Sequence, residues 1–143
     1  MRSFDACNAL SPDRAAILGP LRKVPFTPPA GSGSLPDCQW QHRGSEPEEV
    51  YVIEPATSFD FYNVERYPPG SPVFTISGFN AITGLTYGND PKSSCQIAID
   101  VMENQALGIS YTYWGKIVPM NHDIACQKAR KAAELVMTTL LDS

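Results

Sequence analysis

Cysteine and histidine are the residue types in this chain with the most specific chemistry, and their spacing separates metal binding from disulfide bonding. The 143 residues include four cysteines and two histidines. A structural zinc site usually draws its four ligands from two tight pairs, such as two cysteines with two residues between them. Here the smallest gap between cysteines is 31 positions, and the histidines stand alone. The pattern favours two disulfides over free buried thiols and over a metal site. The cysteines are Cys7, Cys38, Cys95 and Cys126.

The positions of the cysteines also predict how they pair. Cys38 and Cys95 each open a segment expected to be a strand, with the same Cys-Gln-apolar order, so neighbouring strand starts would bring them together. Cys7 precedes the expected first helix, and Cys126 lies near the start of the expected last one. We therefore predict the pairs Cys7–Cys126 and Cys38–Cys95, with the two other connectivities left open. Disulfides persist in oxidising compartments, so we expect the protein outside the cytoplasm.

The histidines give little support for catalysis. His122 stands where a helix should begin, and His42 stands where a strand should end. No Gly-x-Ser-x-Gly elbow accompanies them, and the acidic residues lack the spacing of a calcium loop. We predict no catalytic residue, no cofactor and no metal. The alternative is an envelope hydrolase whose site is assembled from distant loops, with a pair such as His122 and Asp123 or His42 and Glu49.

Aromatic residues are the stronger functional lead. Tyrosine and tryptophan bury a large apolar area while keeping a polar group for hydrogen bonding. An aromatic cluster can serve as core that covers a sheet, or as a groove or patch for an apolar ligand or partner. We carry the second interpretation as a hypothesis of ligand or partner binding. The residues concerned are Phe59, Phe61, Tyr62, Tyr67, Tyr111, Tyr113 and Trp114.

Overall charge and hydropathy limit the classes of partner. The net charge is −4, and charged residues make up 18% of the chain. This balance argues against non-specific binding to nucleic acid or to anionic membranes. The sequence has no apolar run of the roughly 18 residues that a spanning helix needs, and no signal-peptide pattern. Partners are therefore expected to be a protein or an apolar small molecule, and not nucleic acid.

Helices are predicted near both ends of the chain. Ser11 is a good N-cap, Pro12 suits the first helical position, and Gly19 ends a helix of about two turns. Residues 20–37 contain five prolines and are predicted to be an irregular connection. Near the other end, Asn121 or His122 can cap a helix that runs to about Leu141. Its apolar residues recur at steps of three and four, so one face must lie on a sheet.

Strands are predicted between the helices. Alternating apolar residues are clearest at 95–101 and again at 107–113, which predicts a hairpin at the centre of an antiparallel sheet. Shorter strand signals lie at 38–42, 50–53, 73–76 and 79–82. Residues 57–72 are predicted to be a loop or a short helix covering the sheet. The expected fold is α+β, a single domain over 1–143, with a twisted antiparallel sheet that carries a short N-terminal helix and a long C-terminal helix.

Five segments together resemble a known family. The opening Asp5-Ala6-Cys7-Asn8-Ala9-Leu10-Ser11-Pro12 is similar to the Asp-Pro-Cys-x-Leu-Leu-Thr start of the actinobacterial secreted lipoproteins called domain of unknown function 3558. Cys38-x-Trp40 resembles the first strand of that family. Ile76-Ser77-Gly78-Phe79-Asn80-Ala81 resembles its Gly-x-x-Ala segment, and Cys95-x-Ile97-x-Ile99-Asp100-Val101 its central strand. Asp123-Ile124-Ala125-Cys126-Gln127-Lys128-Ala129 resembles its Cys-x-x-Ala final helix. The likeness covers nearly the whole chain.

The resemblance implies a location more than an activity. It implies an extracytoplasmic cell-envelope protein, lipid-anchored or secreted, whose only membrane contact is an N-terminal lipid anchor outside this sequence. Ala6 departs from the family pattern, which has proline there. A similarity to PsbP-like domains is implied at the level of the fold alone. Because the family's function is unassigned, no catalytic residue transfers. The function expected is a non-enzymatic lipoprotein domain that binds a protein partner or an apolar envelope ligand, with a purely structural or sensory module as a further alternative.

Overall fold

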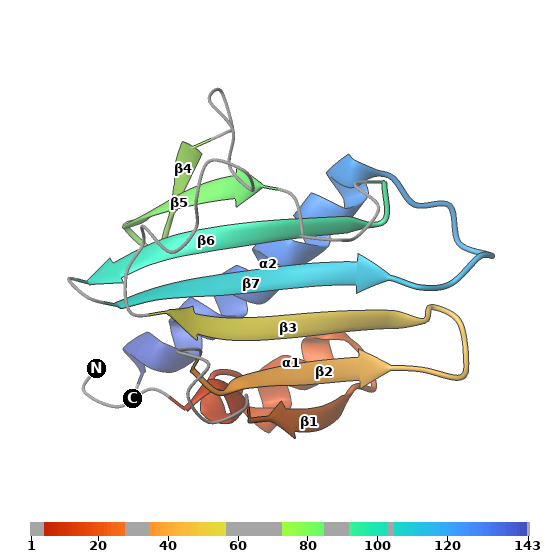
Figure 1. Cartoon of the computed structure of the whole chain (residues 1–143), viewed down its shortest axis with the longest axis horizontal. Coiled ribbons are helices and arrows are strands. Elements are labelled where there is room, and N and C mark those ends of the chain that lie inside the picture. Colours follow the sequence, from red (N-terminus) through yellow and green to blue (C-terminus); the bar gives the residue numbers. More distant parts are fainter. Residues whose placement is uncertain (1–4, 28–34, 57–72, 85–91, 103–104, 143) are drawn as a thin grey trace.

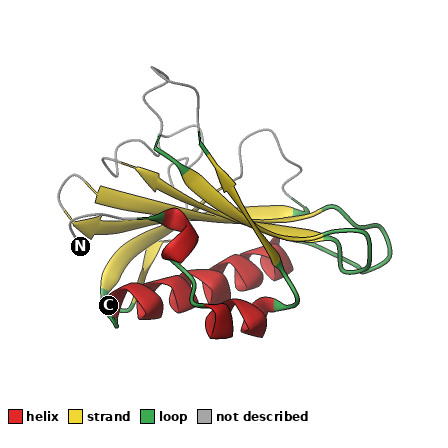
Figure 2. Ribbon diagram, turned by 90° about the horizontal axis from the view of Figure 1, so that it is seen from below, coloured by secondary structure: helices red, strands yellow, loops and turns green. Residues whose placement is uncertain are grey.

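The computed structural model describes residues 5–27, 35–56, 73–84, 92–102 and 105–142. In these residues, seven strands form one antiparallel sheet, and helices cover one of its faces (Figures 1 and 2). The elements, in chain order, are the 3₁₀ turn η1 (Ala6–Asn8), α1 (Pro12–Leu18), β1 (Arg22–Phe26), β2 (Asp37–His42), β3 (Glu49–Ala56), β4 (Val73–Ile76), β5 (Phe79–Gly84), β6 (Ser94–Met102), β7 (Gln105–Tyr113) and α2 (His122–Leu141). The predicted α+β class is confirmed.

The β6–β7 hairpin lies at the middle of the sheet, as the alternation predicted. The strand order is β1-β2-β3-β7-β6-β5-β4, with β7 fourth of seven. Ile97 pairs with Ile109, and Ile97 lies on the same face of the sheet as Cys95, which is bonded to Cys126 of α2. Both isoleucines are fully buried because α2 packs on these two strands. The predicted hairpin turn at residues 103–104 lies outside the described part of the chain.

Both helices have the caps that the sequence predicts. The Ser11 hydroxyl accepts a hydrogen bond from the Arg14 amide at 3.3 Å, and Gly19 caps the end of α1. The side chain of Asn121 accepts one from the Ile124 amide at 2.9 Å, so Asn121 is the N-cap of α2. The buried face of α2 consists mainly of alanine, which lets the helix axis lie close to the sheet. The buried residues of α2 are Ala125, Ala129, Ala132, Ala133, Val136 and Met137.

The prediction that residues 20–37 form only an irregular connection was wrong. Arg22–Phe26 forms β1, which pairs with β2 in antiparallel register. Pro25 lies within this strand, and proline cannot donate to a sheet ladder. It is tolerated because β1 is an edge strand, whose outer side has no neighbour in the sheet. The prolines therefore argued against a strand that can contain one because it lies at the edge of the sheet.

All four cysteines form disulfides, as predicted, but the predicted pairing was wrong. The bonds are Cys7–Cys38 and Cys95–Cys126. Cys38 and Cys95 do not meet because β3 and β7 lie between their strands, and three strand spacings of about 4.8 Å exceed the reach of a disulfide. Each bond instead ties a helical segment to the strand beneath it. One bond holds η1 to β2, and the other holds α2 to β6.

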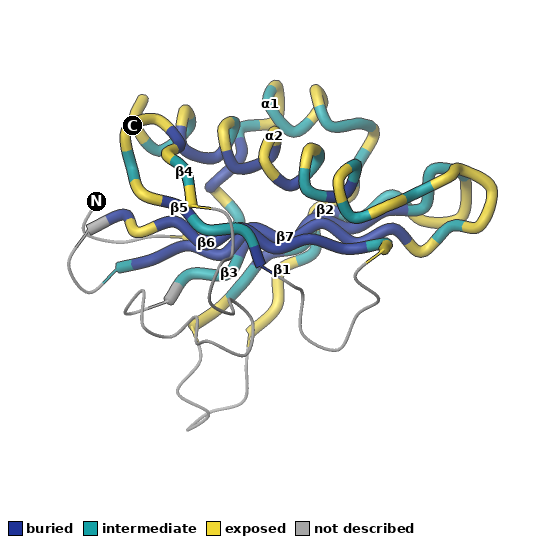
Figure 3. Tube along the Cα trace, turned by 90° about the horizontal axis from the view of Figure 1, so that it is seen from above, coloured by how far each residue is buried: buried dark blue, intermediate teal, exposed yellow. Residues whose placement is uncertain are grey.

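The core lies between the helices and the sheet. Figure 3 shows the central strands and the inner side of α2 as buried, and the ends of the sheet as more exposed. Trp40, Tyr51 and Tyr111 are among the largest buried side chains on the helix-facing side of the sheet. No helix among the described residues is long and apolar enough to cross a bilayer.

Candidate functional site: an exposed apolar loop and an apolar pocket

The seven aromatic residues predicted to form a binding region do not share one surface. Tyr111 is fully buried, and Tyr113 is 5% exposed, so both belong to the core. Trp114 is 53% exposed. The remaining four, Phe59, Phe61, Tyr62 and Tyr67, lie outside the described residues, and their role stays a prediction. Of the three predicted aromatic residues that the structure describes, only Trp114 presents its ring to solvent, as the hypothesis requires.

Trp114 belongs to a loop that exposes further apolar side chains. We call residues 114–118 the 114–118 loop; it follows β7 on the way to α2 (Figure 1). Within it, Ile117 is 78% exposed and Val118 is 39% exposed. Lys116, which precedes Ile117, is also exposed. Isolated surface apolar residues are common, but here three exposed apolar side chains occur within five residues of one loop, and exposed apolar surface that is concentrated in this way is typical of interaction sites.

The 114–118 loop is fixed by hydrogen bonds to the turn between β2 and β3. The Glu46 carboxylate accepts one hydrogen bond from the Tyr113 hydroxyl and another from the Lys116 amide, the second at 3.2 Å. The Tyr113 hydroxyl accepts one from the Val118 amide at 2.9 Å. The Trp114 amide donates to the Glu48 carbonyl at 2.8 Å. Three of these hydrogen bonds use backbone amides of the loop. They therefore fix the backbone while the apolar side chains remain exposed to solvent.

Gly115 completes this arrangement. A Cβ atom at position 115 would collide with the Tyr113 hydroxyl and with both oxygens of Glu46. Any larger residue would have to displace Glu46 or Tyr113, so glycine at this position keeps the pair in place over the backbone. The bond to Tyr113 lowers the pKa of Glu46, and burial together with Glu46 raises the pKa of Tyr113. Sequence reasoning included Tyr113 and Trp114 but missed Glu46, whose role depends on contacts between residues far apart in the chain.

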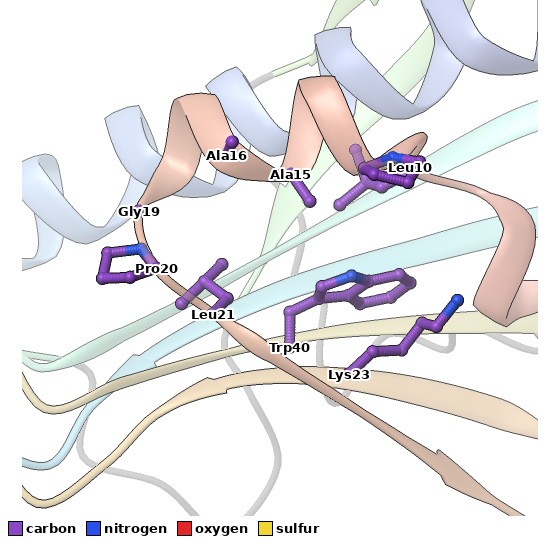
Figure 4. A pocket seen from close by; sticks show the side chains of 9 residues that line it. Leu10, Ala15, Ala16, Gly19, Pro20, Leu21, Lys23 and Trp40 are labelled. Carbon is purple, nitrogen blue, oxygen red and sulfur yellow. The ribbon is translucent and has the colours of Figure 1, made fainter.

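A second feature is a cavity of about 300 Å³ beneath α1. Its lining is mostly apolar, and the Trp40 indole rises into it from β2 (Figure 4). Lys23 lies at its border and donates a hydrogen bond to the Cys7 carbonyl at 3.3 Å. The Cys7–Cys38 disulfide joins η1 to β2, which is the strand that carries Trp40. The lining residues are Leu10, Pro12, Ala15, Ala16, Gly19, Pro20, Leu21, Lys23 and Trp40.

A buried carboxylate lies close to this cavity. Glu49 is 2% exposed, and its Oε2 atom accepts a hydrogen bond from the Tyr111 hydroxyl at 2.8 Å. Lys128 of α2 places its Nζ atom 3.9 Å from the same oxygen. Burial and then the bond to Glu49 raise the pKa of Tyr111, so this hydroxyl stays protonated and donates. The cluster supports the packing of α2 on the sheet.

The side chains of His42 and Glu49, one pair of the enzyme alternative, contact other groups in the structure. Glu49 faces His42 across the β2–β3 ladder but bonds Tyr111. His42 Nε2 lies 3.1 Å from the Ser45 hydroxyl, and its buried Nδ1 has no hydrogen-bond partner among the described residues. A serine–histidine pair needs a third group that orients the imidazole, and this one lacks it. Both histidines are half-buried, and the enzyme alternative stays a prediction.

The fold and these two features define a disulfide-bonded α+β protein with an exposed apolar loop and an apolar pocket. A family model described as a protein of unknown function, DUF3558, matches residues 2–139. The chain belongs to this family, as the five segments indicated. No curated protein matches the chain, and no solved structure matches it.

Proposed function

We propose that this protein is a non-enzymatic, extracytoplasmic domain that binds a protein partner through the 114–118 loop. The observation that carries the proposal is the exposure of Trp114, Ile117 and Val118 on a backbone held by Glu46 and Tyr113. A pre-ordered loop loses little conformational entropy on binding, and tryptophan is among the residues that contribute most to interfaces. The two disulfides are compatible with a location outside the cytoplasm.

The chemistry of the loop favours a particular kind of partner. Three apolar side chains around one exposed cation fit an apolar cleft with an acidic group near its rim, which would pair with Lys116. A membrane surface is the less favourable occupant, because the net charge of −4 opposes binding to anionic lipid. The family resemblance adds a lipid anchor and an envelope location to this proposal. The anchor would hold the domain near its partner without requiring the loop to enter lipid.

A photo-crosslinking amino acid at position 117 tests the proposal in envelope extracts of the organism that encodes the chain. The expected result is one discrete adduct, absent when the same group is placed at position 17. Ile17 is a matched control because it is 57% exposed on α1. The cross-linked protein, once purified, should bind the wild-type domain at least tenfold more tightly than Trp114→Ser, with Ile17→Ser unchanged.

A second variant tests whether the shape of the loop matters. Gly115→Ala keeps every apolar side chain but displaces Glu46 from Tyr113, so it should also weaken binding. Equal affinity for wild type, Trp114→Ser and Gly115→Ala would overturn the proposal. Flotation of the domain with anionic phospholipid vesicles, lost in Trp114→Ser, would overturn it in favour of a membrane role.

A small apolar ligand in the cavity beneath α1 is the second candidate function. The observation that favours it is the apolar lining around Trp40, with Lys23 at the border to pair with an anionic group. The anionic dye 1-anilinonaphthalene-8-sulfonate should bind and quench Trp40 by energy transfer. Ala15→Phe, which fills the cavity, should abolish this binding, and Ile17→Phe on the other side of α1 should not. Dye binding that is the same in both variants would exclude the cavity as its site.

A further inference from the structure

A second group of chemically reactive side chains lies away from the 114–118 loop and the cavity, at the start of α2. Cys95 is the second residue of β6, and His122 and Cys126 are one helical turn apart on α2. The spacing of four residues places His122 and Cys126 on one face of the helix. The two sulfurs and a nitrogen of His122 all lie within 4.8 Å of one another. Among the described residues, no other group of histidine, cysteine and acidic side chains comes this close together.

The imidazole of His122 has a defined orientation. Its Nδ1 atom lies 3.2 Å from the Ser94 carbonyl oxygen. Because a carbonyl can only accept, Nδ1 carries the proton and donates, which leaves the lone pair of the neutral ring on Nε2. Nε2 lies 3.4 Å from the sulfur of Cys126. Metal-binding histidines are held in the same way, with one nitrogen bonded to a carbonyl and the other directed at the ion.

We propose that, after reduction of the Cys95–Cys126 disulfide, both cysteines and His122 bind a thiophilic divalent cation of the Zn²⁺ class. The reductant is a dithiol. Its two thiols become one disulfide, and the protein disulfide takes up the two electrons and two protons to become two thiols. Binding of Zn²⁺ then forms two Zn–S bonds and one Zn–N bond and releases two protons. The fourth position is left to water.

The distances fit such a site. Ordinary Zn–S and Zn–N bond lengths in a tetrahedron place sulfur and nitrogen about 3.6 Å apart, and the Cys126–His122 separation is 3.4 Å. The Cα atoms of the two cysteines are 5.0 Å apart, so side-chain rotation alone can open the sulfurs around an ion. Cys126 is half-exposed and accessible to the reductant, whereas Cys95 is fully buried. A thiolate of the reductant therefore attacks the sulfur of Cys126, and Cys95 leaves as the thiolate.

The other disulfide lacks this arrangement and serves as an internal control. Cys7 is also half-exposed and Cys38 is also buried, with the same sequence separation of 31 residues. The polar side chain next to Cys7 is that of Asp5, whose carboxylate accepts a hydrogen bond from the Cys7 amide at 3.0 Å. No histidine among the described residues completes a group with Cys7 and Cys38. Reduction of this pair therefore leaves two thiols without the imidazole ligand.

The test is a metal titration of the full chain after reduction with a dithiol and anaerobic removal of the reductant. One Zn²⁺ per chain should bind in competition with a chromophoric chelator, and Co²⁺ should give the near-ultraviolet charge-transfer band of cobalt–thiolate bonds. His122→Ala should weaken Zn²⁺ binding at least tenfold, and His42→Ala should not. His122→Ala retains both disulfides when oxidised, so its folding can be checked before reduction.

Paired cysteine variants locate the ion. Cys7→Ser with Cys38→Ser should keep the site, and Cys95→Ser with Cys126→Ser should lose both the Zn²⁺ and the cobalt band. Retention of the band in the second variant, or equal affinity in His122→Ala, overturns the proposal. If the reduced chain unfolds by circular dichroism and Zn²⁺ does not restore its structure, the proposal is also wrong.

Discussion

Two buried carboxyl groups show how the surroundings of single residues set their contribution to stability. Glu49 is 2% exposed but accepts the Tyr111 hydroxyl and lies near Lys128, so its charge is compensated. Asp37 is half-buried, and its Oδ1 atom has no hydrogen-bond partner among the described residues. A buried charge is tolerated when it is paired and hydrogen-bonded, and it is costly otherwise. The two residues should therefore respond to substitution in opposite directions.

Tyr111→Phe should destabilise the fold. The variant keeps the ring in the core but removes the hydrogen bond to Glu49, and leaving a buried acceptor unsatisfied costs about 1–3 kcal/mol. Urea denaturation followed by circular dichroism measures the change. Glu49→Leu combined with Tyr111→Phe should cost less than the sum of the single substitutions, because both remove the same bond. Strictly additive losses would show that the two groups do not interact.

Asp37→Asn should stabilise the fold at neutral pH. Burial raises the pKa of Asp37 above its ordinary value of 3.8, so the ionised form is disfavoured in the folded state. A folded-state pKa above the unfolded value gives stability that is fully present below pH 3.8 and is lost as the pH rises through the folded pKa. The advantage of Asp37→Asn should therefore appear on the alkaline side of that range and vanish at lower pH. Denaturation at several pH values measures it, with the exposed Asp100→Asn as control.

Among the elements, those with local signals were predictable and those set by distant contacts were not. The caps at Ser11 and Asn121 and the alternation in β6 and β7 are written in neighbouring residues, so both helices and the central hairpin were predicted. Strand order is different, because it depends on how whole strands align. The pairing of Cys38 therefore could not be derived from its place at the start of a strand, and β1 was concealed by its proline.

The candidate binding region also combines features that have a local sequence signal with features that depend on distant contacts. Aromatic content drew attention to Tyr113 and Trp114, yet composition does not tell a core tyrosine from an exposed tryptophan. Trp114 is exposed because it lies past the end of β7, where the sheet and α2 no longer cover the chain. The bond between Glu46 and Tyr113 joins residues 67 positions apart, and no local pattern indicates it. The Glu46–Tyr113 bond, which fixes the loop, therefore could not be predicted from the sequence.

The 114–118 loop should loosen in acid. The hydrogen bond from Tyr113 lowers the pKa of Glu46 below its ordinary value of 4.5. A folded-state pKa below the unfolded value gives stability that is present above pH 4.5 and is lost as the pH falls through the folded pKa. Nuclear magnetic resonance of the Glu46 carboxyl carbon and relaxation of the 114–118 amides should report both events together.

Tyr113→Phe provides the control for this loop. Without the hydroxyl, the Glu46 pKa should return toward its ordinary value, and the amides of the loop should be more mobile even at neutral pH. An unchanged Glu46 titration in this variant would show that the bond to Tyr113 does not control the carboxyl group. The Lys116 amide, which also donates to Glu46, is retained in the variant, so the loop should loosen without the domain unfolding.

For the molecule as a whole, the two disulfides act as separate cross-links between the helical layer and the sheet. Cys7–Cys38 holds η1 over β2, and Cys95–Cys126 holds α2 over β6. Arg14 of α1 also bonds to Thr139 and pairs with Asp142 at the far end of α2, which joins the two helical parts. The helical layer is therefore bonded to the sheet at two places, and α1 is joined to the C-terminal end of α2.

Removal of either disulfide should lower the free energy of unfolding by a similar amount. Both bonds join residues 31 positions apart, so each restricts the unfolded chain equally. The loop-entropy relation for a closed loop of this length gives about 3–4 kcal/mol for each bond. Urea denaturation of Cys7→Ser/Cys38→Ser and of Cys95→Ser/Cys126→Ser measures the two losses against wild type. A loss below about 1 kcal/mol in one variant would mean that its disulfide restricts the unfolded chain much less than the relation assumes, as it would if the unfolded chain kept residual structure around the two cysteines.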